Sequence, residues 1–172
     1  MTPMQSPAQF VDQRQVRRNF ARAAAGYDAS AVLQREVASR MLERLEFIRI
    51  DPKRILDLGC GTGASLHALH ERYPQAQTVG ADFSEAMLRA GRGQRSRLGW
   101  LLPFLRGNRA PVLAAEASAL PLQHGAVNML WSNLMLHWLD DPLPAFREMH
   151  RVLAVEGLVM FSTFGQIGRA HV

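Results

Sequence analysis

The feature that most constrains the fold of this chain is a short apolar run that leads into three glycines, ILDLGCGTG at residues 55–63. A strand, a tight glycine turn and a helix form the setting in which such glycines bind a nucleotide-like ligand. Glycine permits backbone angles and a close ligand approach that a side chain would block. The following helix offers free N–H groups. We therefore expect a strand at residues 55–58 and a helix at residues 63–73.

Short apolar runs alternate with helical patterns along the whole chain. The predicted strands are residues 55–58, 78–82, 111–115, 127–132 and 158–163. The predicted helices are residues 13–25, 30–48, 63–73, 84–92 and 142–153. This alternation indicates an α/β fold with a parallel sheet covered by helices on both faces. Residues 91–108, rich in Gly and Arg, are expected to form an extended connection.

Composition and charge limit the partners. The chain has 172 residues, 48% of them hydrophobic, which is enough for one α/β domain with a sizeable core. The net charge is +5, and arginines gather at residues 14–22 and 89–109. They suit an acidic partner, or they solvate helix faces. No nucleic-acid module is recognisable and no aromatics interleave with the arginines, so we predict no nucleic-acid partner.

The single cysteine, Cys60, leaves no internal disulfide and favours a reducing compartment. The first residues lack the apolar core of a signal peptide, and no apolar run approaches the roughly 18 residues of a membrane span. We therefore expect a cytoplasmic protein without a membrane partner. No metal site is predicted.

An acidic residue beyond the glycine turn narrows the ligand. Asp82 ends the second predicted strand, beside the turn in a right-handed β-α-β unit. A carboxylate there can accept both hydroxyls of a ribose, which suits a nicotinamide or an adenosyl cofactor. Ala64 occupies the place of the third glycine of the dinucleotide fingerprint, a replacement that is tolerated. Asp57 would repel a pyrophosphate, whereas it can hold the cationic amino-acid portion of S-adenosylmethionine.

Four segments in succession carry a family resemblance: ILDLGCGTG, VGADFS, AEASALP at residues 115–121 and WSNLMLHW at residues 131–138. Their order and spacing over residues ~50–164 resemble the motifs of class I S-adenosylmethionine-dependent methyltransferases. The resemblance implies a Rossmann-like α/β fold, a parallel sheet of five strands in the order 3-2-1-4-5, and S-adenosylmethionine as cofactor. The family fold has two further strands, which we expect to be missing here.

The resemblance also implies a cofactor site. Its residues are Asp57, Gly59, Cys60, Gly61, Gly63, Asp82, Phe83, Glu116, Ala117, Ser132 and Asn133. Asp57 and Gly59 would line the methionine end. Asp82 would take the ribose, and Phe83 would flank the adenine. Glu116, where many relatives have Asp, and Ala117 would reach the adenine edge. Ser132 or Asn133 would close the pocket floor. Cys60 is interpreted as a small filler of the turn rather than a nucleophile.

Three segments restrict the choice of methyl acceptor by resemblance: residues 17–38, SNLMLHW at residues 132–138, and DPLPAFREMHRVL at residues 141–153. They resemble the malonyl-carrier-protein O-methyltransferases of biotin synthesis, which implies methylation of the free carboxylate of malonyl-acyl-carrier protein. That carboxylate is already ionised, so no general base is required. Residues 1–50 would form a helical lid, with Tyr27 positioning the acceptor, and residues 51–166 the methyltransferase domain. His137 and Trp138 are interpreted as packing residues.

Three alternatives remain open. One is a methyltransferase of another small molecule, such as a quinone precursor or a small organic acid. A nucleic-acid methyltransferase is disfavoured because SNLM stands where adenine-methylating enzymes carry Asn/Asp-Pro-Pro-Tyr. The third is an inactive cofactor-binding fragment. Residues 167–172, IGRAHV, resemble the translation of a sequencing adapter, so we expect a non-native tail and an incomplete domain. Cofactor binding should then survive better than turnover.

Overall fold

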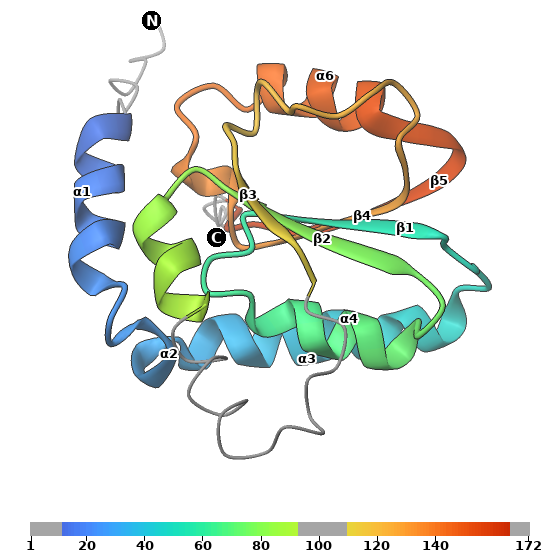
Figure 1. The fold of residues 1–172 in the computed structure, drawn as a ribbon, viewed down its shortest axis with the longest axis horizontal. Coiled ribbons are helices and arrows are strands. Elements are labelled where there is room, and N and C mark those ends of the chain that lie inside the picture. Colours follow the sequence, from blue (N-terminus) through green and yellow to red (C-terminus); the bar gives the residue numbers. More distant parts are fainter. Residues whose placement is uncertain (1–11, 93–109, 166–172) are drawn as a thin grey trace, which may run out of the picture.

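The structure is a computed structural model that describes residues 12–92 and 110–165 (Figure 1). The α-helices are α1 (Gln13–Ala23), α2 (Tyr27–Ser30), α3 (Val32–Arg44), α4 (Ala64–Arg72), α6 (Leu143–Val152) and a helix over residues 85–92. Two short 3₁₀ helices are η1 (Leu45–Phe47) and η3 (Leu136–Trp138). The strands are β1 (Arg54–Leu58), β2 (Gln77–Asp82), β3 (Val112–Ala114), β4 (Val127–Asn133) and β5 (Leu153–Ser162).

All five strands are parallel and lie in the order β3-β2-β1-β4-β5. The central strand β1 pairs Leu56 with Val79 of β2 and with Leu130 of β4. The predicted sheet order is therefore confirmed. Because parallel strands all end at the same edge, the residues that follow β1, β2 and β4 meet there, which is where ligands bind in open α/β sheets.

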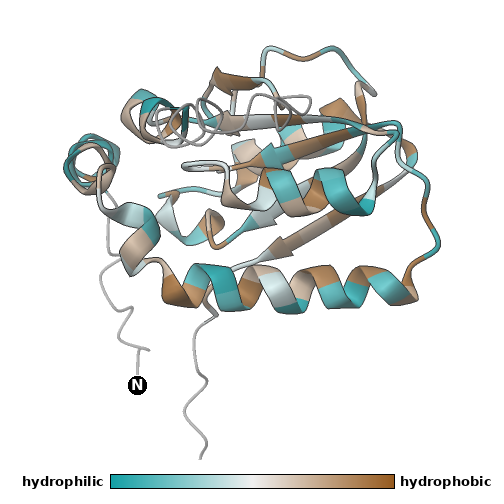
Figure 2. Ribbon diagram, turned by 60° about the horizontal axis from the view of Figure 1, so that its bottom comes forward, coloured by the Kyte–Doolittle hydropathy of each residue, from teal (hydrophilic) through white to brown (hydrophobic). Residues whose placement is uncertain are grey.

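Helices cover both faces of the sheet: α3 and α4 lie on one side and α6 on the other (Figure 1). Side chains alternate between the faces along each strand. Ile55 of β1 packs in a cluster with Met41 of α3 and Leu69 of α4, whereas Leu56 packs in a second cluster with Met149 of α6. Figure 2 shows the hydrophobic strands enclosed between helices of mixed polarity.

Helix α1 begins with a side-chain cap that the sequence supports. The carboxylate of Asp12 accepts hydrogen bonds from the backbone N–H groups of Arg14 and Gln15, at 2.9 and 3.2 Å. These two N–H groups have no partner within the helix, so the cap stabilises this end by about 1 kcal/mol. The helix runs beside the sheet rather than against its faces (Figure 1).

The structure corrects several predicted boundaries. The helix predicted at residues 30–48 is divided, because Ala31 leaves helical geometry with a ψ of 45° and separates α2 from α3. Strand β5 begins five residues earlier than predicted, directly after α6. Its pairing with β4 is irregular, and Glu156 takes a positive φ of 62°, which hides the strand from an alternation pattern.

Two other predictions concern segments that are described only in part or not at all. Residues 91 and 92, predicted to be extended, are helical, and the rest of the predicted connection lies outside the described residues, as do residues 167–172. Within the part of the chain that is described, no helix is both long enough and apolar enough to cross a membrane.

Candidate functional site

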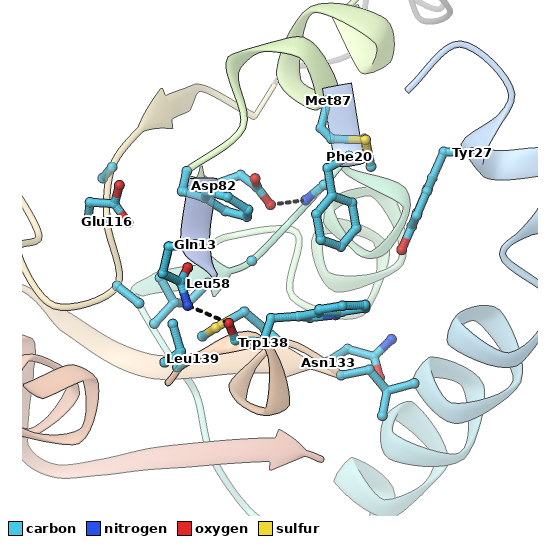
Figure 3. A pocket seen from close by; sticks show the side chains of 17 residues that line it. Gln13, Phe20, Tyr27, Leu58, Asp82, Met87, Glu116, Asn133, Trp138 and Leu139 are labelled. Atoms are coloured by element: carbon cyan, nitrogen blue, oxygen red, sulfur yellow. Dashed lines mark hydrogen bonds between the residues drawn. The ribbon is translucent and has the colours of Figure 1, made fainter. Parts of the chain in front are cut away.

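A cleft opens where β1, β2 and β4 end, and α1 forms one of its walls (Figure 3). Its empty space is about 670 Å³, part of it open to solvent, which is within the size range of small-molecule sites. The lining residues are Gln13, Phe20, Tyr27, Leu58, Gly59, Gly61, Asp82, Phe83, Met87, Ala115, Glu116, Ala117, Asn133, Leu134, Met135, Trp138 and Leu139.

The glycine turn forms the floor of this cleft at the end of β1. The N–H groups of Gly59 and Cys60 both donate to the carbonyl of Ala81, at 2.8 and 3.1 Å, which fixes the turn against β2. Gly59 has a φ of 78°, and a Cβ added to it would lie 2.5 Å from Cγ of Met135. Only glycine therefore satisfies both the backbone conformation and the space at this position.

Asp82 is held at the cleft by backbone N–H groups. Its Oδ2 accepts from Gly61 N and its Oδ1 from Ser84 N, both at 2.8 Å. Burial raises the pKa of the Asp82 carboxyl, while these two N–H groups oppose the rise. Each carboxylate oxygen can accept two hydrogen bonds. Asp82 therefore keeps acceptor capacity on both oxygens for a ligand in the cleft.

Ser84 stands directly before the helix over residues 85–92, but its side chain does not cap that helix. It is 2% exposed, and its Oγ has no hydrogen-bond partner in the part of the chain that the structure describes. The structure instead uses its backbone N–H to orient Asp82. The serine thus serves the cleft through its main chain, a role that a capping pattern does not indicate.

Asp57 is buried behind the glycine turn and is not one of the residues that line the cleft. It is 2% exposed, and its Oδ2 has no hydrogen-bond partner among the described residues. Burial, and secondarily the charge of Asp82, raises the pKa of the Asp57 carboxyl to about 8. Alternation along β1 explains the placement, because Asp57 shares a face with Ile55 while Leu58 points to the other side.

One rim of the cleft combines Phe83, Glu116 and Ala117, which the sequence predicts at the adenine. All three line the cleft. Arg17 of α1 forms an ion pair with Glu116 and lies over the ring of Phe83, with its guanidinium carbon 5.4 Å from the ring centroid. The side chains of Arg17 and Glu116 are both about half exposed, so this pair contributes little to global stability. It does connect α1 to this rim.

The opposite rim is aromatic and also contacts α1. Phe20 lies edge-on to Trp138, with ring centroids 5.2 Å apart, and its centroid is 6.1 Å from that of Tyr27. Gln13 Nε2 donates to the carbonyl of Trp138 at 2.6 Å. Helix α1 therefore contacts both rims of the cleft. Burial, followed by the charges of Asp82 and Asp28, raises the pKa of the Tyr27 hydroxyl.

Four predicted residues have less direct positions. Ser132 is fully buried and does not line the cleft. Asn133 lines it, but its side chain bonds the carbonyl of Gln34 and the hydroxyl of Ser162, each at 2.8 Å. Cys60 is 8% exposed and packs within the turn. Gly63 precedes α4 with a φ of 85°. Cys60 and Gly63 lie outside the lining as well.

Sequence reasoning missed several lining residues, among them Gln13, Met87 and Met135. Trp138, interpreted as a packing residue, packs against Phe20, and it also lines the cleft and is 40% exposed. Trp138 and Met135 lie within WSNLMLHW, so their closeness in sequence to Asn133 could have indicated that they line the cleft. No local pattern indicates Gln13, because its partner is 125 residues away in the chain.

A family model described as a methyltransferase domain matches residues 56–161, which include the glycine turn, Asp82 and all of the sheet except Arg54, Ile55 and Ser162. The chain belongs to this methyltransferase family. Its motifs and its sheet order thus agree with the predicted family, whose cofactor is S-adenosylmethionine. The roles of individual cleft residues stay predictions.

Similar proteins agree with this assignment. A malonyl-[acyl-carrier protein] O-methyltransferase of Gallionella capsiferriformans is 48% identical over 155 residues, covering 90% of this chain and 52% of that protein. One of Laribacter hongkongensis is 47% identical, covering 91% and 52%. The chain thus spans about half the length of the curated relatives it matches. The geranyl diphosphate C-methyltransferase of Streptomyces coelicolor shares the fold, with a TM-score of 0.59, 23% identity and coverage of 74% and 46%.

Proposed function

We propose that this chain is the cofactor-binding part of an S-adenosylmethionine-dependent methyltransferase that esterifies the free carboxylate of malonyl-acyl-carrier protein, a step of biotin precursor synthesis. The acceptor is supported by the names of the relatives that are 48% and 47% identical. The single buried cysteine supports a reducing compartment, and we place the protein in the cytoplasm on that basis.

The observation that carries the cofactor proposal is the arrangement of Asp82. Its two oxygens are oriented by Gly61 and Ser84, and each retains an acceptor site beside an open cleft. A pair of ribose hydroxyls matches such an acceptor, and charge-assisted bonds of this kind contribute about 1.5–3 kcal/mol each. Glu116 and Ala117 would hold the adenine edge and Phe83 its face.

The methionine end would lie toward the glycine turn. Gly59 presents bare backbone there, and the buried Asp57 has an oxygen without a partner. A positive charge nearby lowers the pKa of a carboxyl, so a bound ammonium would favour the ionised form of Asp57. The residues present therefore fit the cofactor at both of its ends.

When bound, S-adenosylmethionine supplies an electrophilic methyl group to a nucleophile held in line with it. A malonyl carboxylate is ionised at neutral pH, so the chain needs no base to activate it. What the chain contributes is alignment and exclusion of water, for which proximity can supply roughly 7–11 kcal/mol.

Tyr27 is the residue that we propose positions the acceptor or the methionine end. It lies in the cleft beside Phe20, and no hydrogen bond within the described part of the chain occupies its hydroxyl. Tyr27→Phe should weaken cofactor binding or turnover about 3- to 10-fold, the value of one hydrogen bond. Tyr73→Phe is the matched control, since Tyr73 ends α4 outside the cleft. Equal kinetics of the two variants would refute this role.

The function is tested by titrating the full chain with S-adenosylmethionine in a calorimeter and then offering several acceptors with a radiolabelled methyl donor. We expect binding, and transfer to malonyl-carrier protein in preference to quinone precursors, small organic acids or RNA. Absence of cofactor binding would overturn the cofactor proposal. Transfer to a quinone precursor but not to malonyl-carrier protein would overturn the acceptor.

A further inference from the structure

The outer face of α1 carries a row of three arginines, Arg14, Arg18 and Arg22, which we call the arginine row. Residues four apart in a helix lie about 40° apart around its axis, so the three side chains follow one face. All three are exposed. In Figure 2, α1 lies at the left, seen nearly along its axis, and is mostly hydrophilic in colour.

The arginine row has almost no carboxylate to neutralise it. The helix itself contains no Asp or Glu. Arg18 approaches the capping Asp12 only at 4.0 Å, and within the described part of the chain Arg14 and Arg22 form no ion pair. Its unpaired charge therefore remains available to a partner.

Helix α3 shows what an ordinary solvated face looks like in the same protein. Its arginines alternate with glutamates, and Arg40 pairs with Glu36 at 2.8 Å, one turn away. Such i,i+4 pairs are common on solvent-facing helices. Helix α1, by contrast, contains no carboxylate one turn from any arginine of the arginine row.

The position of the arginine row relates it to the cleft. The opposite face of α1 carries the buried Val16 together with Phe20 and Gln13, and the last two line the cleft. Arg17, on the side of the helix, pairs with Glu116 on the rim. A partner bound to the arginine row would therefore lie on the outside of the wall whose inside faces the proposed cofactor.

We propose that the arginine row is the docking surface for an acidic face of the acyl carrier protein that delivers the malonyl group. This inference rests on the proposed function. A row of guanidinium groups is complementary to a row of carboxylates, and such complementarity raises association rates and fixes orientation. A single-stranded nucleic acid fits less well, because it binds aromatic side chains interleaved with basic ones, and the outer face of α1 has no aromatic residue.

The test compares two triple variants of the full chain. The row variant carries Arg14→Gln, Arg18→Gln and Arg22→Gln. The control carries the same change at Arg44, Arg49 and Arg54, which are exposed and lie away from the cleft. Both variants lower the formal net charge of +5 by three, so general electrostatic attraction is matched.

Binding of fluorescently labelled malonyl-carrier protein is measured by anisotropy at low and at physiological ionic strength. We expect the row variant to bind about tenfold more weakly at low ionic strength and to lose most of the salt dependence. The control should change less than about twofold, and cofactor affinity should be equal in all three proteins. Methyl transfer to malonyl-pantetheine, an acceptor without a protein, should also be unchanged in the row variant.

Several outcomes would overturn the proposal. Equal carrier affinity of the row variant and the parent would overturn the docking surface and leave the proposed function standing. An equal loss in both variants would show that net charge, and not the arginine row, attracts the carrier. Loss of RNA binding in the row variant with carrier binding intact would assign the row to nucleic acid. A parent that binds no malonyl-carrier protein at any ionic strength would overturn the proposed function with it.

Discussion

The buried carboxyl of Asp57 leads to a prediction that joins stability to cofactor binding. Asp57→Asn keeps the shape of the side chain and removes its ability to ionise. Asp57 is 2% exposed and its Oδ2 has no hydrogen-bond partner within residues 12–92 and 110–165, so its ionisation in the folded chain is unfavourable. The substitution should therefore make the chain more stable at neutral pH while weakening its hold on the cationic end of S-adenosylmethionine.

The magnitude follows from the pKa. Burial first, and the charge of Asp82 second, raises the pKa of Asp57 from 3.8 to about 8. The pKa of Asp57 is higher in the folded state than in the unfolded state. The contribution of this carboxyl to the free energy of unfolding is therefore fully present below pH ~4 and is lost as pH rises toward ~8. The loss is about 1.4 kcal/mol per pH unit, or up to about 4 kcal/mol at pH 7. Asp57→Asn has no such loss.

Urea unfolding of parent and variant at several pH values between about 4 and 8 measures this difference. The variant should match the parent near pH 4 and become progressively more stable above it. Asp51→Asn, which removes an exposed carboxyl just before β1, is the control and should show no such trend. A stability difference that does not change with pH, or a variant less stable than the parent at pH 7, would refute the reasoning. Calorimetric titration with S-adenosylmethionine supplies the second readout.

Two further substitutions test the glycine turn and the ion pair of Glu148 with Arg151 on α6. Gly59→Ala places a Cβ 2.5 Å from Met135 Cγ at a residue with a φ of 78°, so it should lower the free energy of unfolding by about 2–4 kcal/mol and weaken cofactor binding. Gly26→Ala is the control, because a Cβ added there has no atom of the described residues within 4 Å, its chain neighbours aside. Equal effects of the two substitutions would contradict the steric argument. Hydrogen bonds from the Arg151 side chain and from the backbone N–H of Leu120 lower the pKa of Glu148 to about 2. The stabilising contribution of this carboxylate is therefore present above pH ~4.5 and is lost as pH falls toward ~2. Glu148→Gln should therefore unfold at lower urea concentration than the parent at pH 6 and match it near pH 2, and a constant difference would count against this ion pair.

Much of the architecture was predictable because it rests on local patterns. Each apolar run that precedes a turn became a strand of the sheet, and the glycine turn at Gly59 and the acidic end of β2 at Asp82 lie where the motif spacing places them. These features depend on residues close together in the chain, whose conformational preferences are strong. The resemblance to a known family added the order of the strands.

The face of the sheet to which a side chain points was harder to predict from the sequence. Asp57 and Ser132 both stand in motifs that end at the cleft, yet both are buried and neither lines it. Near the end of a strand, a shift of one residue moves a side chain to the other face. A motif therefore predicts the position of the backbone more reliably than the environment of each side chain.

By itself, the sequence determined the parallel sheet, the glycine turn and the acidic residue beside it, because short-range geometry limits what such segments can form. The tertiary structure decided how α1 closes the cleft. Gln13 meets the carbonyl of Trp138 across 125 residues, and Arg17 meets Glu116 across 99. Contacts at such separations depend on the packing of the whole chain, which no local pattern records. The same packing turns one face of α1 toward the cofactor site and leaves its arginine row exposed.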